Sequence, residues 1–147
     1  MLRKARTMIS NGDLGEIRSF RGVHAEDYMA SINSPYTWRH DPEGGGALAD
    51  LGSHIIATAE FLVGPISSVF GESITSIRTR KNRHGEEKTI KVDDITRAFI
   101  KFQNEATGCI EANWIATGRK MQHDFEIYGS KGALFFSQEL FPHRAID

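Results

Sequence analysis

The stretch Gly44-Gly45-Gly46-Ala47-Leu48-Ala49-Asp50-Leu51-Gly52-Ser53-His54 decides how this chain folds. Apolar residues recur at helical spacing after the glycines, and Gly64-Pro65 ends the pattern, so we predict a helix over residues 48–63. In such a helix Asp50 and His54 stand four residues apart, on one face and one turn from each other. The glycines before the helix allow the backbone to approach another group closely.

Shorter elements flank this helix. Residues 2–11 have the spacing of a short amphipathic helix, residues 15–25 suggest a strand, and residues 27–46 form a long loop rich in aromatic side chains. Strand-like runs separated by turn residues follow at 66–77, 95–103, 108–116, 123–128 and 133–137. Early helices and late consecutive strands predict an α+β domain, with a mostly antiparallel, open-faced sheet and helices packed on one side.

The alternation within these strands bears on partners. In residues 95–102 one set of side chains is apolar and the other mixes charges with large apolar groups, and residues 109–116 repeat this pattern. A semi-polar open face of this kind is a candidate for subunit association. A solvated face with scattered apolar residues is the alternative that the sequence leaves open.

Composition sets further limits. A chain of 147 residues with 39% hydrophobic and 25% charged residues is long enough for one core, so one domain is expected. The net charge of -1 gives no argument for nucleic acid or a membrane as partner, and the basic run at 78–83 is predicted to be a solvated hairpin tip. The single cysteine, Cys109, lies in an apolar strand pattern and is predicted to be a buried structural thiol. Without a signal peptide or a long apolar stretch, we expect a cytoplasmic protein.

The pair Asp50 and His54 allows three interpretations. Both could be structural, since an aspartate near a helix N-terminus is favoured by the helix dipole. Both could bind a metal, although no neighbouring motif supplies a third ligand, and we predict no metal site. They could also act in acid–base catalysis, because a histidine transfers protons near neutral pH and an aspartate one turn away can orient its ring. The local pattern does not decide between these interpretations.

Five motifs in fixed order carry more information than the pair alone. They are Asn11-Gly12-Asp13-Leu14-Gly15-Glu16-Ile17, Thr37-Trp38-Arg39-His40-Asp41-Pro42, the glycine run with Asp50-Leu51-Gly52-Ser53-His54, Val92-Asp93-Asp94, and Phe125-Glu126-Ile127-Tyr128-Gly129-Ser130-Lys131-Gly132. From its first helix through Phe136 the chain resembles the C-terminal domain of the Gfo/Idh/MocA family of NAD(P)-dependent oxidoreductases. The resemblance implies the C-terminal fold of glyceraldehyde-3-phosphate dehydrogenase-like enzymes.

The resemblance also implies roles for single residues. His54 would be the general base that takes a hydroxyl proton from a sugar or polyol, and Asp50 would orient His54 and bind substrate hydroxyls. The resemblance further implies a homodimer or homotetramer that associates through the sheet face. The substrate and cofactor crevice would be lined by Trp38, Arg39, Gly45, Gly46, Trp114 and Arg119.

Two features of the family are missing from this sequence. The chain has neither a strand followed by Gly-x-Gly-x-x-Gly nor the Glu-Lys-Pro motif of the nucleotide-binding domain. We therefore expect residues 1–12 to be a remnant of the interdomain helix and residues 13–147 to be a truncated substrate and oligomerisation domain, with the final strands absent after Ile146 and the Rossmann domain absent. NAD or NADP would bind the full-length enzyme only, and this chain alone would be inactive. The alternative is a non-catalytic binding or dimerisation module that retains the family scaffold.

Overall fold

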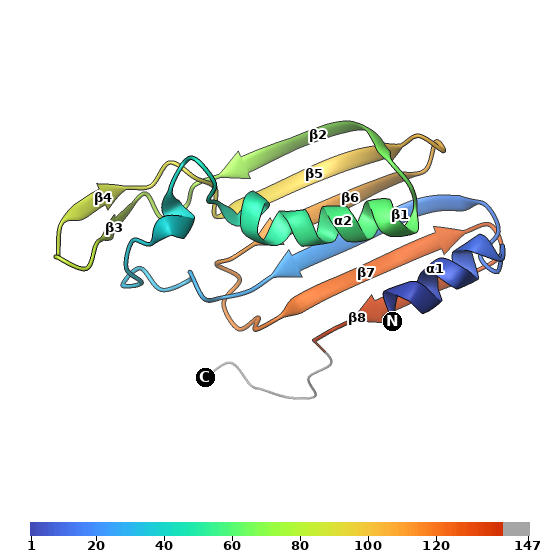
Figure 1. Cartoon of the computed structure of the whole chain (residues 1–147), viewed down its shortest axis with the longest axis horizontal. Coiled ribbons are helices and arrows are strands. Elements are labelled where there is room, and N and C mark those ends of the chain that lie inside the picture. The colour runs from blue at the N-terminus through green and yellow to red at the C-terminus, as the bar shows by residue number, and fades with distance from the viewer. Residues whose placement is uncertain (140–147) are drawn as a thin grey trace.

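The computed structural model describes residues 1–139 (Figure 1). Its elements are α1 (Leu2–Ser10), β1 (Ile17–Ala25), η1 (Trp38–His40), η2 (Leu48–Gly52), α2 (Ser53–Leu62), β2 (Ile66–Ile74), β3 (Thr79–Lys81), β4 (Glu87–Thr89), β5 (Ile95–Phe102), β6 (Thr107–Asn113), β7 (Gln122–Gly129) and β8 (Ala133–Ser137). Here η1 is a 3-10 turn and η2 is a turn of π-helix that leads into α2. The expected end of the domain near Ile146 lies outside the described residues.

A six-stranded sheet in the order β2-β5-β6-β1-β7-β8 forms the body of the structure. The pairing of β1 with β6 is parallel and the other four pairings are antiparallel. The helices α1 and α2 lie across one face, and the hairpin of β3 and β4 extends beyond one end of the sheet (Figure 1). The predicted α+β class, with a mostly antiparallel sheet and helices on one side, is confirmed.

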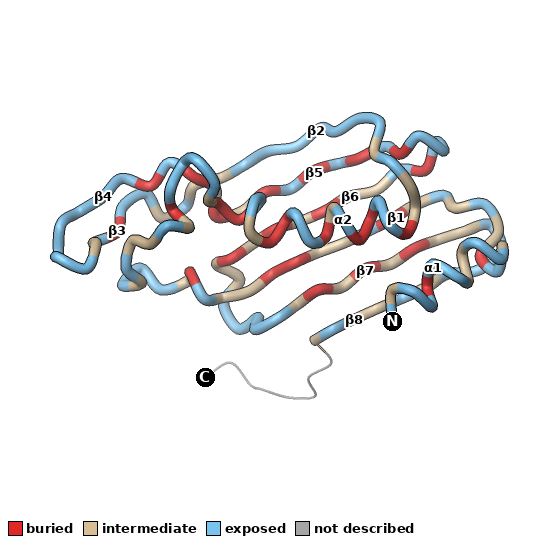
Figure 2. Tube along the Cα trace, viewed as in Figure 1, coloured by how far each residue is buried: buried red, intermediate tan, exposed pale blue. Residues whose placement is uncertain are grey.

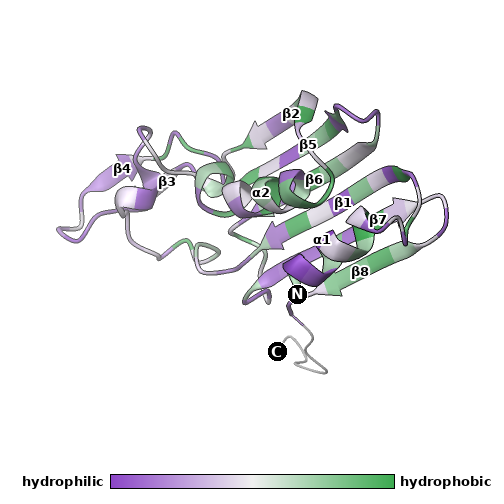
Figure 3. Cartoon of the chain, turned by 45° about the vertical axis from the view of Figure 1, so that its right-hand side comes forward, coloured by the Kyte–Doolittle hydropathy of each residue, from purple (hydrophilic) through white to green (hydrophobic). Residues whose placement is uncertain are grey.

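The core lies between the sheet and the two helices. Along β5 and β7 buried residues alternate with more exposed ones, so each strand turns one side to the helices (Figure 2). Hydropathy follows this alternation only in part, because hydrophobic residues also occur at exposed positions of the strands (Figure 3). Phe20 of β1, Ile55 of α2 and Phe102 of β5 are completely buried there. By contrast, Phe70 and Phe99 are 78% and 71% exposed on the opposite face, which none of the described helices covers.

A second core cluster surrounds Trp114, just after β6. The carboxylate of Asp94 is completely buried, and it accepts hydrogen bonds from Trp114 Nε1 at 2.8 Å and from the backbone amides of Ser76 and Ile77 at 2.7 and 2.8 Å. Three donors compensate the cost of burying this charge. Its neighbour Asp93 accepts the amide of Leu48 at 2.9 Å and thereby fixes the start of η2. The Val92-Asp93-Asp94 motif therefore holds the helix that carries Asp50 and His54.

Two local predictions need correction. Arg80, within the basic run expected to be solvated, is only 2% exposed, because its guanidinium donates to the carbonyl oxygens of Met29, Ser31 and Ser34 at 2.6 to 3.1 Å. Cys109 is half-buried and lies on the open face of the sheet, because the alternation of β6 turns Ile110 and not Cys109 toward the helices. Within residues 1–139, neither helix combines the length and apolarity needed to cross a membrane.

Candidate active site

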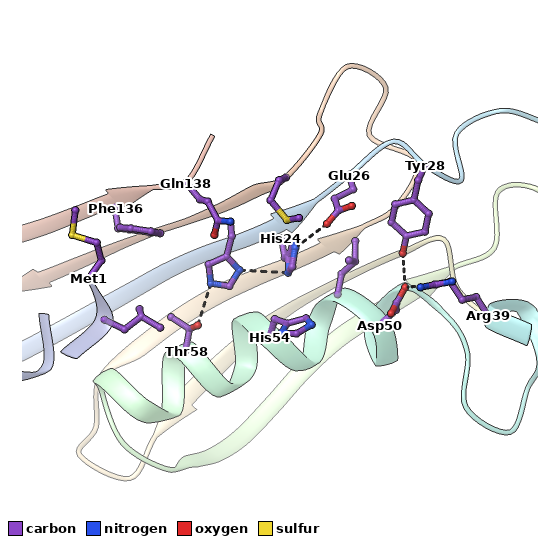
Figure 4. Close-up of a pocket in the computed structure, with 14 residues that line it drawn as sticks. Met1, His24, Glu26, Tyr28, Arg39, Asp50, His54, Thr58, Phe136 and Gln138 are labelled. Atoms are coloured by element: carbon purple, nitrogen blue, oxygen red, sulfur yellow. Dashed lines mark hydrogen bonds and ion pairs between the residues drawn. The ribbon is translucent and has the colours of Figure 1, made fainter. Parts of the chain in front are cut away.

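A pocket of about 780 Å³ lies between the N-terminal part of α2 and the adjoining ends of β1 and β7 (Figure 4). Most of its side chains come from segments distant in sequence. It is lined by Met1, Leu2, His24, Glu26, Tyr28, Arg39, Asp50, Leu51, His54, Thr58, Met121, His123, Phe136 and Gln138. Three of the residues predicted from sequence, Asp50, His54 and Arg39, thus line one pocket.

The carboxylate of Asp50 is held by two donors. Tyr28 Oη donates to Asp50 Oδ2 at 2.5 Å, and Arg39 Nε donates to the same oxygen at 2.9 Å (Figure 4). Burial, together with the hydrogen bond to and charge of Asp50, raises the pKa of Tyr28, so the phenol remains a protonated donor at neutral pH. The guanidinium of Arg39 also lies over the Trp38 ring, with its central carbon 4.5 Å from the ring centroid. Together, Tyr28, Arg39 and Asp50 form a polar wall of the pocket.

Asp50 lies in the π-helical turn Leu48–Gly52, whose hydrogen-bonding pattern is wider than that of an α-helix, and His54 lies in the first turn of α2. Both residues line the same pocket. Asp50 points toward Tyr28 and Arg39, and His54, the second residue of α2, points toward His24 (Figure 4). The structure thus brings both predicted residues into one pocket while giving each its own set of neighbours.

Two further histidines lie beneath His54. His24 of β1 and His123 of β7 are cross-strand partners, with ring centroids 4.9 Å apart and Nδ1 atoms 3.4 Å apart. The His24 and His54 rings meet edge-on, with centroids 5.4 Å apart. His24 Nε2 lies 3.3 Å from Glu26 Oε1. Burial lowers the pKa of His24, although its hydrogen bond to Glu26 and the charge of that carboxylate oppose this shift. Burial, and the nearby His24 and His54, lower the pKa of His123 to about 4.

The glycines before η2 serve the folding of the loop itself. A Cβ at Gly45 would lie 1.9 Å from the carbonyl oxygen of Arg39. Gly46 has φ +99°, and a Cβ there would lie 2.3 Å from Asp93 Oδ1. Because neither glycine has a side chain, the loop can pack directly against the backbone of Arg39 in η1 and against Asp93. The predicted crevice residues Gly45 and Gly46 therefore act here by bringing Arg39 and the start of η2 together.

Three other predicted residues are found away from the pocket lining. Trp114 is completely buried and is tied to Asp94 by its indole nitrogen, as described above. Arg119 pairs with Glu139 at 3.4 Å. Trp38 is 66% exposed and touches the site through Arg39. Among residues 1–139, no group of three or more His, Cys, Asp or Glu side chains is arranged to hold a metal ion.

Several pocket residues could not be selected from the sequence pattern. His24 and His123 occupy helix-facing positions of their strands, and a histidine in an otherwise apolar strand face is the only signal that marks them. Tyr28 and Glu26 lie where β1 runs into the loop at 27–46, which has no clear periodicity. Chemically, the pocket combines an accessible imidazole with neighbouring donors and carboxylates, a set suited to binding hydroxyl groups and moving a proton.

Comparisons with known proteins identify the family to which this fold belongs. Residues 2–135 match the family described as the GFO/IDH/MocA C-terminal domain. A levoglucosan dehydrogenase from Pseudarthrobacter phenanthrenivorans is 35% identical over 150 residues, which cover 92% of this chain but only 38% of that protein. The chain thus spans little more than a third of the length of this relative.

Solved structures show the same fold. The structure of levoglucosan dehydrogenase in complex with NADH and levoglucosan has a TM-score of 0.86 at 38% identity, covering 92% of this chain and 36% of that one. That of an NAD binding oxidoreductase from Klebsiella pneumoniae has a TM-score of 0.90 at 34% identity, covering 93% and 37%.

The fold and the pocket, taken with these likenesses, define the class of protein. A sheet covered on one face by helices, with the start of α2 bringing Asp50 and His54 to a pocket, is the C-terminal domain of an oxidoreductase. The chain belongs to the Gfo/Idh/MocA family.

Proposed function

We propose that this chain is the substrate-binding part of an NAD(P)-dependent oxidoreductase that acts on a sugar or polyol hydroxyl by hydride transfer. The observation that carries the proposal is the pocket in which the exposed His54 imidazole stands beside the polar wall of Tyr28, Arg39 and Asp50. The relatives support the substrate class, because those named above include a levoglucosan dehydrogenase and its complex with levoglucosan.

Within the proposed reaction, His54 is the base. Its imidazole takes the proton of a substrate hydroxyl while hydride leaves the carbon that bears that oxygen. The second carboxylate oxygen of Asp50 and the remaining guanidinium donors of Arg39 are suited to neighbouring hydroxyls, which fixes the reacting carbon beside His54. A bound nicotinamide supplies the hydride acceptor.

The glycine-rich segment of this chain does not fit the pyrophosphate of a dinucleotide. A Cβ at Gly46 would meet the Asp93 carboxylate, and an anion at this position would repel phosphate. The sequence also contains no strand followed by Gly-x-Gly-x-x-Gly. We therefore assign cofactor binding to another part of the full-length protein, with residues 1–12 belonging to the connection between the two parts. This chain alone is then inactive.

The open sheet face is the proposed surface for a homodimer or homotetramer. Phe70 and Phe99 are direct cross-strand partners there, and Phe135 on β8 is 65% exposed. Exposed aromatic side chains in register across a sheet are typical of an interface. The same observation favours the second candidate function, a non-catalytic dimerisation module that keeps the scaffold.

Turnover by the full-length protein separates these two functions. With NAD⁺ or NADP⁺ and a panel of sugars and polyols, the enzyme produces reduced cofactor, whereas a module produces none. His54→Ala is expected to lower turnover by about 10²-fold or more while cofactor binding, followed by fluorescence titration, is unchanged. The matched control is His84→Ala in the exposed turn between β3 and β4. Equal turnover in the two variants would remove His54 from the role of base.

A further inference from the structure

The histidines beneath His54 belong to a hydrogen-bonded chain with a definite direction. A carboxylate only accepts hydrogen bonds, so His24 Nε2 carries a proton and donates to Glu26 Oε1 at 3.3 Å. A neutral His24 then has a bare Nδ1, which accepts from His123 Nδ1 at 3.4 Å. His123 Nε2 is bare in turn and accepts from Thr58 Oγ1 at 3.1 Å. The chain therefore runs from Thr58 through His123 and His24 to Glu26 (Figure 4).

Two members of this hydrogen-bonded chain, Thr58 and His24, flank His54. Thr58 lies one helical turn after His54 on α2, and His24 presents its ring edge-on to the His54 ring. The side chain of Glu26 is only 16% exposed, so its negative charge is held close to the cluster. The titratable or charged side chains that share the pocket with His54 are His24 and Glu26 from β1 and its end, His123 from β7, Tyr28 and Arg39 from the following loop and η1, and Asp50 from η2.

The negative charge of Asp50 is already balanced by its own neighbours. Its Oδ2 atom accepts from both Arg39 and Tyr28, and the guanidinium of Arg39 opposes its charge at 2.9 Å. Glu26 has a neutral partner instead, because burial favours the uncharged form of His24. Of the two pocket carboxylates, Glu26 therefore keeps the larger uncompensated negative charge.

We infer that His24 is a positioning residue for His54, and that Glu26, through its hydrogen bond to His24, provides the countercharge for the imidazolium that forms when His54 takes a proton. This inference rests on the proposed function, in which His54 is the base. The two buried rings stay neutral, so the positive charge is carried by the accessible His54 ring. His123 donates to the unprotonated Nδ1 of His24, and Thr58 donates to His123. These two bonds hold the His24 ring in one orientation.

The tautomers of the two rings test the chain without any measurement of turnover. Nitrogen-15 NMR of histidine side chains in the full-length protein at pH 7 is expected to show the proton on Nε2 of His24 and on Nδ1 of His123. In His123→Phe the His123 donor to His24 Nδ1 is removed. The signals of His24 are then expected to show a mixture of the two neutral tautomers instead of one. A His24 that carries its proton on Nδ1, or on both nitrogens, at pH 7 would overturn the inference.

Kinetics test the role of the countercharge. Glu26→Gln keeps an acceptor for His24 and removes only the charge, so the acidic limb of the kcat/KM profile is expected to move to lower pH by about half a unit, with kcat reduced by about tenfold and KM nearly unchanged. The control is Asp27→Asn, which removes a charge from the adjacent residue, where Asp27 pairs with Lys120 at 2.6 Å and does not line the pocket. An effect on KM alone would make Glu26 a substrate ligand and would overturn the inference, as would an equal shift in Asp27→Asn.

A double variant shows whether Glu26 acts through His24. If it does, the double variant His24→Phe with Glu26→Gln has the same kcat as His24→Phe alone. If the two residues act independently, the two reductions in kcat multiply. Thermal unfolding confirms that each variant folds, and if His24→Phe does not, the Glu26→Gln profile and the tautomers still decide the question. A wild-type protein without any dehydrogenase activity would refute the proposed function, and the NMR result would then stand alone as the test of the hydrogen-bonded chain.

Discussion

The burial of His123 makes the stability of this protein depend on pH in a calculable way. Folding lowers the pKa of His123 from 6.5 to about 4, because the residue is only 9% exposed and lies beside two other histidines. Between these values the unfolded chain binds a proton that the folded protein excludes, so the free energy of unfolding falls as the pH drops below 6.5. Integrating this difference from pH 7 to pH 4.5 gives a loss of about 2 kcal/mol for this one residue.

The substitution His123→Gln isolates the contribution of this one residue to the pH dependence of stability. Urea unfolding, followed by tryptophan fluorescence at pH 7 and pH 4.5, is expected to show that the wild type loses about 2 kcal/mol more than the variant over this interval. Contributions from carboxylates are common to both proteins and cancel in the comparison. The control His84→Gln, in the exposed hairpin turn, is expected to lose as much as the wild type. Equal losses in His123→Gln and wild type would refute the reasoning, because the ring would then be free to protonate in the folded state.

Three further changes test other parts of the structure. Arg80→Met leaves the carbonyl oxygens of Met29, Ser31 and Ser34 without their donor and is expected to lower the free energy of unfolding by about 3 kcal/mol, measured in urea. The exposed control Arg83→Met should change it by less than about 0.5 kcal/mol. Gly46→Ala forces a side chain into a backbone with φ +99° and against Asp93, so a drop of about 2 kcal/mol is expected, and an unchanged midpoint in thermal unfolding would contradict the close approach. Phe99→Lys, on the open sheet face, is expected to dissociate the proposed oligomer in analytical ultracentrifugation with little effect on protomer stability; an unchanged sedimentation coefficient would argue against this face as the interface.

The elements of this fold were predictable wherever one side of a segment is buried. The two faces of β5 follow from apolar spacing, and the structure confirms them. The helix predicted over 48–63 is α-helical over Ser53–Leu62 and begins with a π-helical turn. The π-helical turn at Leu48–Gly52 did not follow from that spacing, because the residues that stabilise it are remote. Asp93 holds its first amide, and Tyr28 and Arg39 draw Asp50 aside. Spacing along a helix therefore located Asp50 and His54 but could not give their partners.

The histidine pair was beyond sequence reasoning for a related reason. His24 and His123 meet because β1 pairs with β7 in the register that sets these two residues opposite each other, and about a hundred positions separate them in the chain. Register is fixed by the whole buried face of both strands and by the turns at their ends, here the packing of Phe20 against Phe125. A single histidine on such a face gives no sign of its partner.

The motifs that could be recognised in the sequence have mainly structural roles around the pocket. Asp93 and Asp94 bind backbone amides and the Trp114 indole, and Gly45 and Gly46 allow the loop to reach Arg39, so these residues build the frame of the site. The groups expected to meet a substrate divide instead into two sets within the pocket. Tyr28, Arg39 and Asp50 offer donors and an acceptor for hydroxyls, whereas His54 stands over the neutral rings and the carboxylate of Glu26.

This separation has a chemical consequence. A carboxylate already bound by a guanidinium and a phenol is a good ligand for hydroxyl groups and a poor countercharge for an imidazolium. If Asp50 supported His54 directly, Asp50→Asn would shift the acidic limb of the kcat/KM profile as Glu26→Gln does. With the bonding seen here, Asp50→Asn instead releases Tyr28 and Arg39 and is expected to raise KM by about tenfold while the acidic limb stays in place. A shift of that limb in Asp50→Asn, with KM unchanged, would return the supporting role to Asp50.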